Sequence, residues 1–151
     1  MAEKQTRPLC GTGVIILNKD DKMLIAKRKK QPLYGFPGGH LERYDSFEEC
    51  AHKEIEEETG MYIPPEKIKF LGMMNIVEKE NGFHYIDIYL VCRLPEDQTP
   101  KNMEPWSHEE WEWWSMEDIQ KRKVETFYPI QQFLKYTEIF NLEHVKKLIG
   151  E

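Results

Sequence analysis

The segment between Ser46 and Gly60 constrains the fold most strongly, because both of its ends carry helix signals. Ser46 and Glu49 have the spacing of a capping box, in which two side chains close the first turn of a helix. Gly60 stands where helices commonly end in the left-handed conformation, and the Pro64-Pro65 pair prevents the helix from resuming. We therefore predict a helix over residues 46–59.

This helix turns three carboxylates toward its apolar side. At about 100° per residue, its inward stripe is marked by the apolar residues Phe47, Cys50, Ala51 and, if the helix ran that far, Met61. Glu54, Glu57 and Glu58 fall on the same stripe, where neighbouring like charges cost roughly a few tenths of a kcal/mol per pair. Partial burial and the negative end of the helix dipole increase that cost. A divalent cation would relieve it, and carboxylate oxygens suit Mg²⁺ or Mn²⁺; a solvated acidic surface is the alternative interpretation.

Hydrophobic alternation and turn residues predict strands on both sides of this helix. The expected strands cover residues 12–17, 23–26, 67–77, 83–92 and 112–115. An Asn81-Gly82 turn should join the third and fourth of them into a hairpin. Further helices are expected over residues 116–120, 129–140 and 142–149, and loops over residues 31–39 and 94–103. This order predicts a mixed α/β fold with helices packed on a sheet.

Composition limits the classes of protein and partner. The chain has 151 residues, of which 40% are hydrophobic and 32% charged, so we expect one globular domain over residues 1–151. Its 21 basic and 27 acidic residues leave a net charge of −6, which disfavours general binding to nucleic acid polymers or anionic membranes. No apolar run could span a membrane, and the first ten residues lack the apolar core of a signal peptide. Three widely spaced cysteines favour a reducing, cytoplasmic compartment and provide no zinc ligand pairs.

The stretch GHLERYDSFEECAHKEIEEETGM, residues 39–61, resembles the Nudix hydrolase signature, G-x5-E-x7-R-E-U-x-E-E-x-G-U, in which U is a bulky aliphatic residue. The positions that match in register are Gly39, Glu54, Ile55, Glu57, Glu58, Gly60 and Met61. Two positions depart from the pattern, with Asp45 in place of Glu and Lys53 in place of Arg. Both keep their charge, but lysine lacks the planar donor fork of arginine, so we expect weaker anchoring of the loop beneath the site.

The resemblance covers roughly residues 10–135 and is to the small MutT-like branch, which includes eukaryotic nucleoside-triphosphate diphosphatases and the plant cytosolic Nudix hydrolase 1 group. It implies the Nudix α/β/α sandwich, a mixed sheet flanked by helices, often as a homodimer. It also implies hydrolysis, with Mg²⁺ or Mn²⁺, of a nucleoside triphosphate to a nucleoside monophosphate and pyrophosphate.

By this resemblance, metal ligands and catalytic groups are Glu54, Glu57, Glu58 and Glu109, with the Gly38 carbonyl as a further ligand. Glu104 and Glu110 are the alternatives to Glu109, which could equally be a solvated loop residue. The expected substrate-binding residues are Arg28, Phe36, Gly39, His40, Phe127 and Tyr128. Arg28 would bind phosphate and the aromatic residues the base, although a basic sheet edge and ordinary packing explain the same residues.

The leading functional interpretation is therefore a cytoplasmic Nudix diphosphatase that acts on a nucleoside triphosphate, including oxidised or non-standard ones such as 8-oxo-dGTP. A second is hydrolysis of another diphosphate, such as dihydroneopterin triphosphate or an isoprenyl diphosphate. A third is a non-catalytic Nudix module that binds a nucleotide. The aromatic residues at 83–89 and 111–114 are too many for one face of a small sheet to bury completely, so we expect them to form a homodimer surface.

Overall fold

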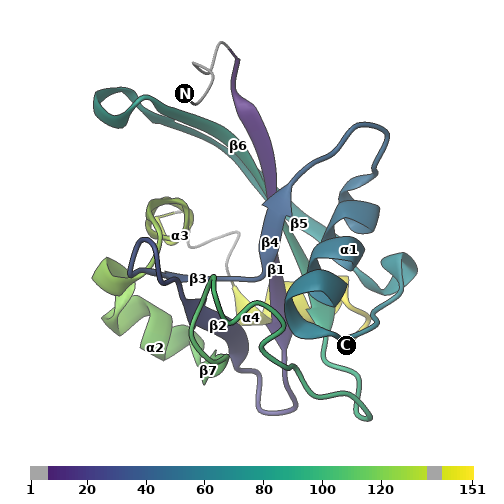
Figure 1. Ribbon diagram of the computed structural model, residues 1–151. Coiled ribbons are helices and arrows are strands. Elements are labelled where there is room, and N and C mark those ends of the chain that lie inside the picture. Colours follow the sequence, from purple (N-terminus) through teal and green to yellow (C-terminus); the bar gives the residue numbers. More distant parts are fainter. Residues whose placement is uncertain (1–6, 136–140) are drawn as a thin grey trace.

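The computed structural model describes residues 7–135 and 141–151 (Figure 1). The strands are β1 (Leu9–Leu17), β2 (Met23–Lys27), β3 (Tyr34–Gly35), β4 (Gly38–His40), β5 (Lys69–Glu78), β6 (Phe83–Arg93) and β7 (Glu112–Trp114). The α-helices are α1 (Phe47–Thr59), α2 (Met116–Lys121), α3 (Tyr128–Phe133) and α4 (Leu142–Leu148). Single 3-10 turns lie at η1 (Pro65–Lys67), η2 (Lys79–Asn81) and η3 (Lys123–Glu125).

The strands form one mixed sheet with β1 at its centre. The order is β3-β2-β1-β6-β5, with β4 also paired to β1 and β7 to β2. β1 and β6 run parallel over nine residue pairs, and the other pairings are antiparallel. β1 therefore pairs directly with three other strands, β2, β4 and β6.

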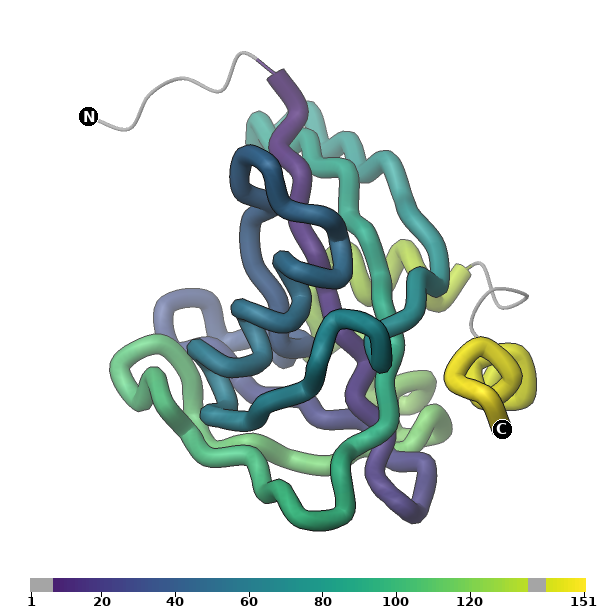
Figure 2. The backbone as a smooth tube through the Cα atoms, turned by 90° about the vertical axis from the view of Figure 1, so that its right-hand side faces the viewer, coloured from purple at the N-terminus to yellow at the C-terminus, as the bar shows by residue number. Residues whose placement is uncertain are grey.

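Alternation along β1 divides the core between two layers of helices. Val14 and Ile16 pack with Ile55 of α1 on one face, whereas Ile15 and Leu17 pack with residues of α2, α3 and α4 on the other. In Figure 2, α1 lies in front of the strands and α3 behind them. The predicted fold class, a mixed sheet flanked by helices, is therefore confirmed. Within the described residues, no helix combines the length and apolar character that crossing a membrane requires.

The ends of α1 follow the predicted signals. The Ser46 hydroxyl accepts a hydrogen bond from the Glu49 N–H at 3.0 Å, and the Glu49 carboxylate accepts one from the Ser46 N–H at 3.1 Å. Gly60 has φ 73°, and its N–H donates to the Glu56 carbonyl. Local chemistry alone thus defines where this helix begins and ends.

The predicted loop over residues 31–39 is wrong, because this segment contains β3 and the start of β4. Gly38 pairs with Gly13 of β1, and a Cβ atom added to Gly38 would overlap the Thr12 carbonyl. Glycine therefore acts here as a strand residue, because only a missing side chain lets β4 approach β1 this closely.

The helix predicted over residues 129–140 is shorter in the structure. α3 ends at Phe133, and Lys135 donates its N–H to the Gln132 carbonyl in a tightened last turn. Residues 136–140 lie outside the described part of the chain. The other predicted strands and helices are present with ends shifted by one to three residues.

The expected exposed aromatic surface at residues 111–114 is wrong for Trp114, whereas Trp111 and Trp113 are half-buried. Trp114 is buried, with its ring centroid 4.5 Å from that of Tyr34 and the Arg122 guanidinium 3.9 Å above it. Trp111 and Trp113 pack against the core beneath α1. Trp114 of β7 therefore belongs to the core, and Trp113 packs at the margin of the core.

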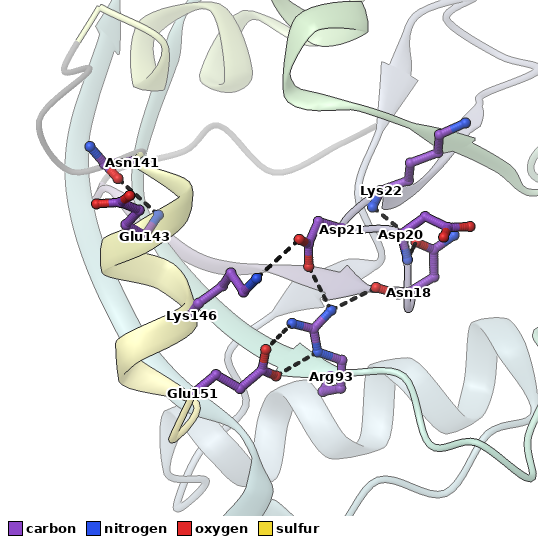
Figure 3. Close-up of polar contacts among 9 residues, drawn as sticks. All are labelled: Asn18, Asp20, Asp21, Lys22, Arg93, Asn141, Glu143, Lys146 and Glu151. Atoms are coloured by element: carbon purple, nitrogen blue, oxygen red, sulfur yellow. Dashed lines mark hydrogen bonds and ion pairs between the residues drawn. The ribbon is translucent and has the colours of Figure 1, made fainter.

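A polar cluster ties α4 to the body of the protein (Figure 3). Arg93, at the end of β6, donates to both carboxylate oxygens of Glu151, to Asp21 Oδ1 at 2.9 Å and to the Asn18 carbonyl at 2.6 Å. Lys146 of α4 donates to Asp21 Oδ2 at 3.2 Å. The cluster thereby links the C-terminal end of the chain to the turn between β1 and β2.

Arg93→Ala should lower the free energy of unfolding by about 1–2 kcal/mol, because it removes several charged hydrogen bonds at a partly exposed site. Chemical denaturation measures this change. The matched control is Lys121→Ala, which breaks a single exposed ion pair to Glu117 and should cost less than about 0.5 kcal/mol. Equal effects in the two variants would contradict a stabilising role for the cluster.

Candidate active site

A cleft of about 710 Å³ opens on the face of the sheet opposite α1, within the usual range for small-molecule sites. Its floor is formed by Gly11 and Gly13 of β1 and by Tyr85, Asp87 and Tyr89 of β6. Its walls include Arg28, Phe36, Gly38, Gly39, His40, Phe83, Phe127 and Tyr128. The cleft therefore contains all six predicted substrate-binding residues.

Glu58 reaches from α1 to the edge of this cleft. Its side chain is buried, and its Oε2 accepts a hydrogen bond from the Gly38 N–H at 3.1 Å. The pKa of Glu58 is raised to about 8, mainly by burial. The charge of Arg28 and the Gly38 hydrogen bond lower this pKa, and the charges of Glu54 and Glu104 raise it. The predicted inward orientation of this carboxylate is confirmed.

Glu54 lies against β4, one helical turn before Glu58. A Cβ atom added to Gly39 would overlap the Glu54 carboxylate, so the glycine leaves the space that this carboxylate occupies. Burial raises the pKa of Glu54 to about 7, with further contributions from the charges of Glu57, Glu104 and Glu42. Two carboxylates thus lie in a partly desolvated site where their ionised forms are disfavoured.

Glu57 differs from its prediction. Its side chain is exposed, although the helical wheel places it on the inward stripe with Glu54 and Glu58. The buried stripe of α1 runs through Cys50, Ala51, Ile55 and Glu58, so Glu57 lies at its margin. The charge of Glu57 nevertheless raises the pKa of Glu54, so Glu57 lies beside the site although its side chain is exposed.

Of the two loop acids, Glu104 and not Glu109 is among the charges that raise the pKa values of the α1 carboxylates. The loop before β7 folds onto the end of α1: Lys101 donates its N–H to the Thr59 carbonyl at 2.9 Å, and Met103 to the Glu58 carbonyl at 3.3 Å. These bonds bring Glu104 close enough to raise the pKa of both Glu54 and Glu58. Glu109 is exposed, and its N–H donates to the Lys27 carbonyl.

The two departures from the signature pair with each other. Lys53 Nζ lies 2.6 Å from Asp45 Oδ2 and 3.7 Å from Glu42 Oε2. The hydrogen bond to Asp45 raises the pKa of Lys53. The loop before α1 is therefore anchored to the helix by a lysine–aspartate pair.

The substrate-binding candidates form an aromatic and basic wall. The Arg28 guanidinium lies 4.9 Å from the centre of the Phe127 ring, and its charge also acts on Glu58. His40 Nε2 and the Tyr85 hydroxyl are hydrogen-bonded at 3.0 Å. Arg28 therefore lies between the carboxylates and the aromatic part of the cleft, where a phosphorylated ligand would need a cation.

The carboxylates fit a divalent cation in chemistry, although they do not form a closed ligand set in this conformation. Among residues 7–135 and 141–151, no three His, Cys, Asp or Glu side chains converge closely enough to hold a metal ion. Glu54 and Glu58 nevertheless present hard oxygen donors whose mutual repulsion a cation would relieve. Glu54 and Glu58 are thus the best-placed metal ligands, with Glu57 and Glu104 beside them.

These features define a class: an α/β sandwich in which an acidic helix and a glycine-rich strand meet at an open cleft. The NUDIX domain family model matches residues 8–133, and the chain belongs to this family. The crystal structure of a MutT NUDIX hydrolase from Burkholderia pseudomallei has the same fold, with a TM-score of 0.72 at 23% identity over 85% of this chain and 97% of that one.

Two sequence relatives carry different substrate names. A Bacillus subtilis protein provisionally named 8-oxo-dGTP diphosphatase is 48% identical over 33% of this chain and 34% of its own length. The ADP-ribose pyrophosphatase of Methanocaldococcus jannaschii is 38% identical over 50% of this chain and 46% of its own length. The chain thus matches less than half of each relative.

In the metal-free protein, stability should decrease as the pH rises from about 5 to about 8. The carboxyl of Glu58 has an ordinary pKa of 4.5 but titrates at about 8 in the fold, so the folded state binds more protons over this interval. Each pKa unit corresponds to about 1.4 kcal/mol, and we expect a loss of at least about 1 kcal/mol. Denaturation in the presence of a chelator measures it.

Glu58→Gln should flatten this pH dependence, because the amide does not titrate. Glu56→Gln, an exposed residue of the same helix, is the matched control and should retain the full slope. If wild type and Glu58→Gln showed identical slopes, Glu58 would not be the buried acid that the geometry indicates.

Proposed function

We propose that this protein is a metal-dependent diphosphatase that hydrolyses a nucleoside triphosphate, including oxidised or non-standard ones such as 8-oxo-dGTP, to a nucleoside monophosphate and pyrophosphate. One observation carries the proposal: a nucleotide-sized cleft lined by Arg28 and aromatic residues also contains Gly38 and Gly39, which contact the buried carboxylate of Glu58 and the half-buried carboxylate of Glu54. The provisional name of the Bacillus subtilis relative supports the same substrate class.

Glu54 and Glu58 would hold the cation, together with Glu57 and the Gly38 carbonyl. Mg²⁺ is the proposed ion and Mn²⁺ the substitute, because both prefer oxygen ligands. A bound ion of this kind neutralises phosphate charge and lowers the pKa of bound water.

The side chains around the cleft supply the remaining functions. Arg28 binds phosphate oxygens with its guanidinium fork. Phe127 and Tyr128 on one wall, with His40 on the other, enclose the base. Phe36 is buried against Tyr89 and supports the floor, with ring centroids 6.4 Å apart.

Hydrolysis requires a proton acceptor for the attacking water. Glu104 is half-buried and lies near both α1 carboxylates, so we assign it this role. The water oxygen bonds to phosphorus, one P–O bond of the anhydride breaks, and pyrophosphate separates from the monophosphate. The water proton passes to the Glu104 carboxylate.

The test is a substrate panel with Mg²⁺, in which released pyrophosphate and phosphate are measured for each compound. The panel contains dGTP, 8-oxo-dGTP, dATP, dihydroneopterin triphosphate, an isoprenyl diphosphate and ADP-ribose, the last because of the archaeal relative's name. Pyrophosphate release from a nucleoside triphosphate supports the proposal. Hydrolysis of only dihydroneopterin triphosphate, ADP-ribose or the isoprenyl compound would favour the second function. Binding without hydrolysis would favour the non-catalytic module.

Glu58→Gln and Glu57→Gln should each reduce turnover by at least about 100-fold, because a lost metal ligand removes charge stabilisation from the transition state. Steady-state kinetics on the best substrate of the panel measures this effect. Glu56→Gln, on the solvated side of α1, should stay within about threefold of wild type. Near-wild-type turnover in both ligand variants would contradict the proposed metal site.

Glu104→Gln should reduce turnover by at least about tenfold, because a neutral amide cannot accept the proton. Glu109→Gln, in the same loop but exposed, should change it by less than about threefold. The comparison discriminates between the two loop acids. The reverse ranking would return the role to Glu109, as first expected from the sequence.

Three other expectations stay predictions: membership of the branch that includes plant cytosolic Nudix hydrolase 1, a cytoplasmic location, and a homodimer. For the homodimer, the edge strand β5 presents three exposed apolar side chains, Phe70, Met73 and Val77. Sedimentation at micromolar concentration would show whether the 18.1 kDa chain pairs.

A further inference from the structure

Asp87 lies on the floor of the cleft, away from the α1 carboxylates. It is paired in register with Gly11 of β1, and Gly11 is in turn paired with His40 of β4. Tyr89 is paired with Gly13, which is next to Gly38. Asp87 and Tyr89 are two residues apart on β6, a spacing of about 6.6 Å along a strand. Glu58 is bonded to Gly38, which is on the Tyr89 side, so Asp87 lies farther from the Glu58 carboxylate than Tyr89 does.

The Asp87 carboxylate has no bonding partner among the described residues. Glu78, another acid of the same cleft, accepts a hydrogen bond from Asn81 Nδ2 at 2.8 Å, and Glu58 accepts one from Gly38. Asp87 is half-buried and faces the open cleft, so its carboxylate oxygens are free to accept hydrogen bonds from a ligand in the cleft. Burial raises the pKa of Asp87 to about 6, which leaves the group mainly ionised at neutral pH.

The surroundings of Asp87 leave space for a flat ligand. A Cβ atom on Gly11 would lie 3.3 Å from Asp87 Oδ1, so any larger residue would crowd the carboxylate. Tyr85 and Phe83 stack with ring centroids 4.4 Å apart, and Tyr85 is held by its hydrogen bond to His40. A planar ring entering beside these aromatics would meet Asp87 with its edge.

An ionised carboxylate accepts two hydrogen bonds from adjacent donors and repels an edge that presents an unprotonated ring nitrogen. The 2-amino-4-oxopyrimidine edge presents two such donors, a ring N–H and an exocyclic amino group. Guanine, 8-oxoguanine and the pterins share this edge. Adenine instead presents one amino group beside an acceptor nitrogen.

We propose that Asp87 is the specificity-determining residue of the cleft and selects substrates with a 2-amino-4-oxopyrimidine edge through two charge-assisted hydrogen bonds. The inference rests on the proposed function and narrows its substrate class. It favours a guanine nucleotide or a pterin over an adenine-containing substrate such as ADP-ribose.

The test compares kcat/KM for dGTP and dITP, which differ only in the 2-amino group. Wild type should prefer dGTP by at least about tenfold, since one hydrogen bond to a charged group is lost with dITP. Asp87→Asn and Asp87→Ser should each reduce this ratio to below about threefold. Because both substrates are measured on one preparation, the ratio is independent of the fraction of folded protein. Glu78→Gln, an acid of the same cleft that already has a partner, is the matched control and should keep the wild-type ratio.

Binding of dGMP and dIMP to the metal-free protein, measured by calorimetry, separates this inference from the proposed function. A panel without hydrolysis would refute the diphosphatase, whereas Asp87 would still be tested by the ratio of the two dissociation constants. Equal ratios in wild type and Asp87→Asn, by both measurements, would overturn the inference. The compound with the largest kcat/KM among dGTP, 8-oxo-dGTP and dihydroneopterin triphosphate then shows whether the preferred ring that carries the 2-amino-4-oxopyrimidine edge is a guanine or a pterin.

Discussion

The hydrogen bond between the Gly38 N–H and the Glu58 carboxylate is the interaction on which the site depends. It joins α1 to β4, and β4 is joined to β1 through Gly38 itself. The bond only partly offsets the cost of burying Glu58, because the pKa of this group remains far above its ordinary value. Stability and function therefore compete at this position: the fold tolerates a strained electrostatic arrangement that packing of an apolar residue would avoid, as is common at functional sites.

Along β1, the same face of the sheet lines the cleft at one end of the strand and belongs to the hydrophobic core at the other. Gly11 and Gly13 leave the cleft open at one end of the strand, whereas Ile15 and Leu17 fill the core with aliphatic side chains at the other. The side chains of β6 follow the same division, since Asp87 faces the cleft and Val91 the core. A strand with period-two alternation thus carries two functions because the size of its residues changes along its length.

The parts of the structure that local chemistry controls were predictable from the sequence. The capping box and Gly60 defined α1. The spacing of its glutamates indicated three inward carboxylates, of which Glu58 and Glu54 are buried or half-buried and Glu57 is exposed. The parts that depend on long-range contacts were not predictable. Nothing local distinguishes Glu104 from Glu109, because their placement follows from backbone bonds between their loop and α1. Likewise, the sequence of β4 resembles a loop because its pairing with β1 depends on distant residues. The burial of Trp114 could not be predicted because it depends on the pairing of β7 with β2.

The loop that carries Glu104 also solves a problem created by the acidic helix. The last turn of α1 has no basic residue, and its carbonyl groups would be left without donors at the negative end of the helix dipole. The N–H groups of Lys101 and Met103 supply those donors at the carbonyls of Thr59 and Glu58. The same two bonds carry the next residue, Glu104, to the carboxylate pair. The same two hydrogen bonds therefore supply donors at the end of the helix and place a further acid near the site.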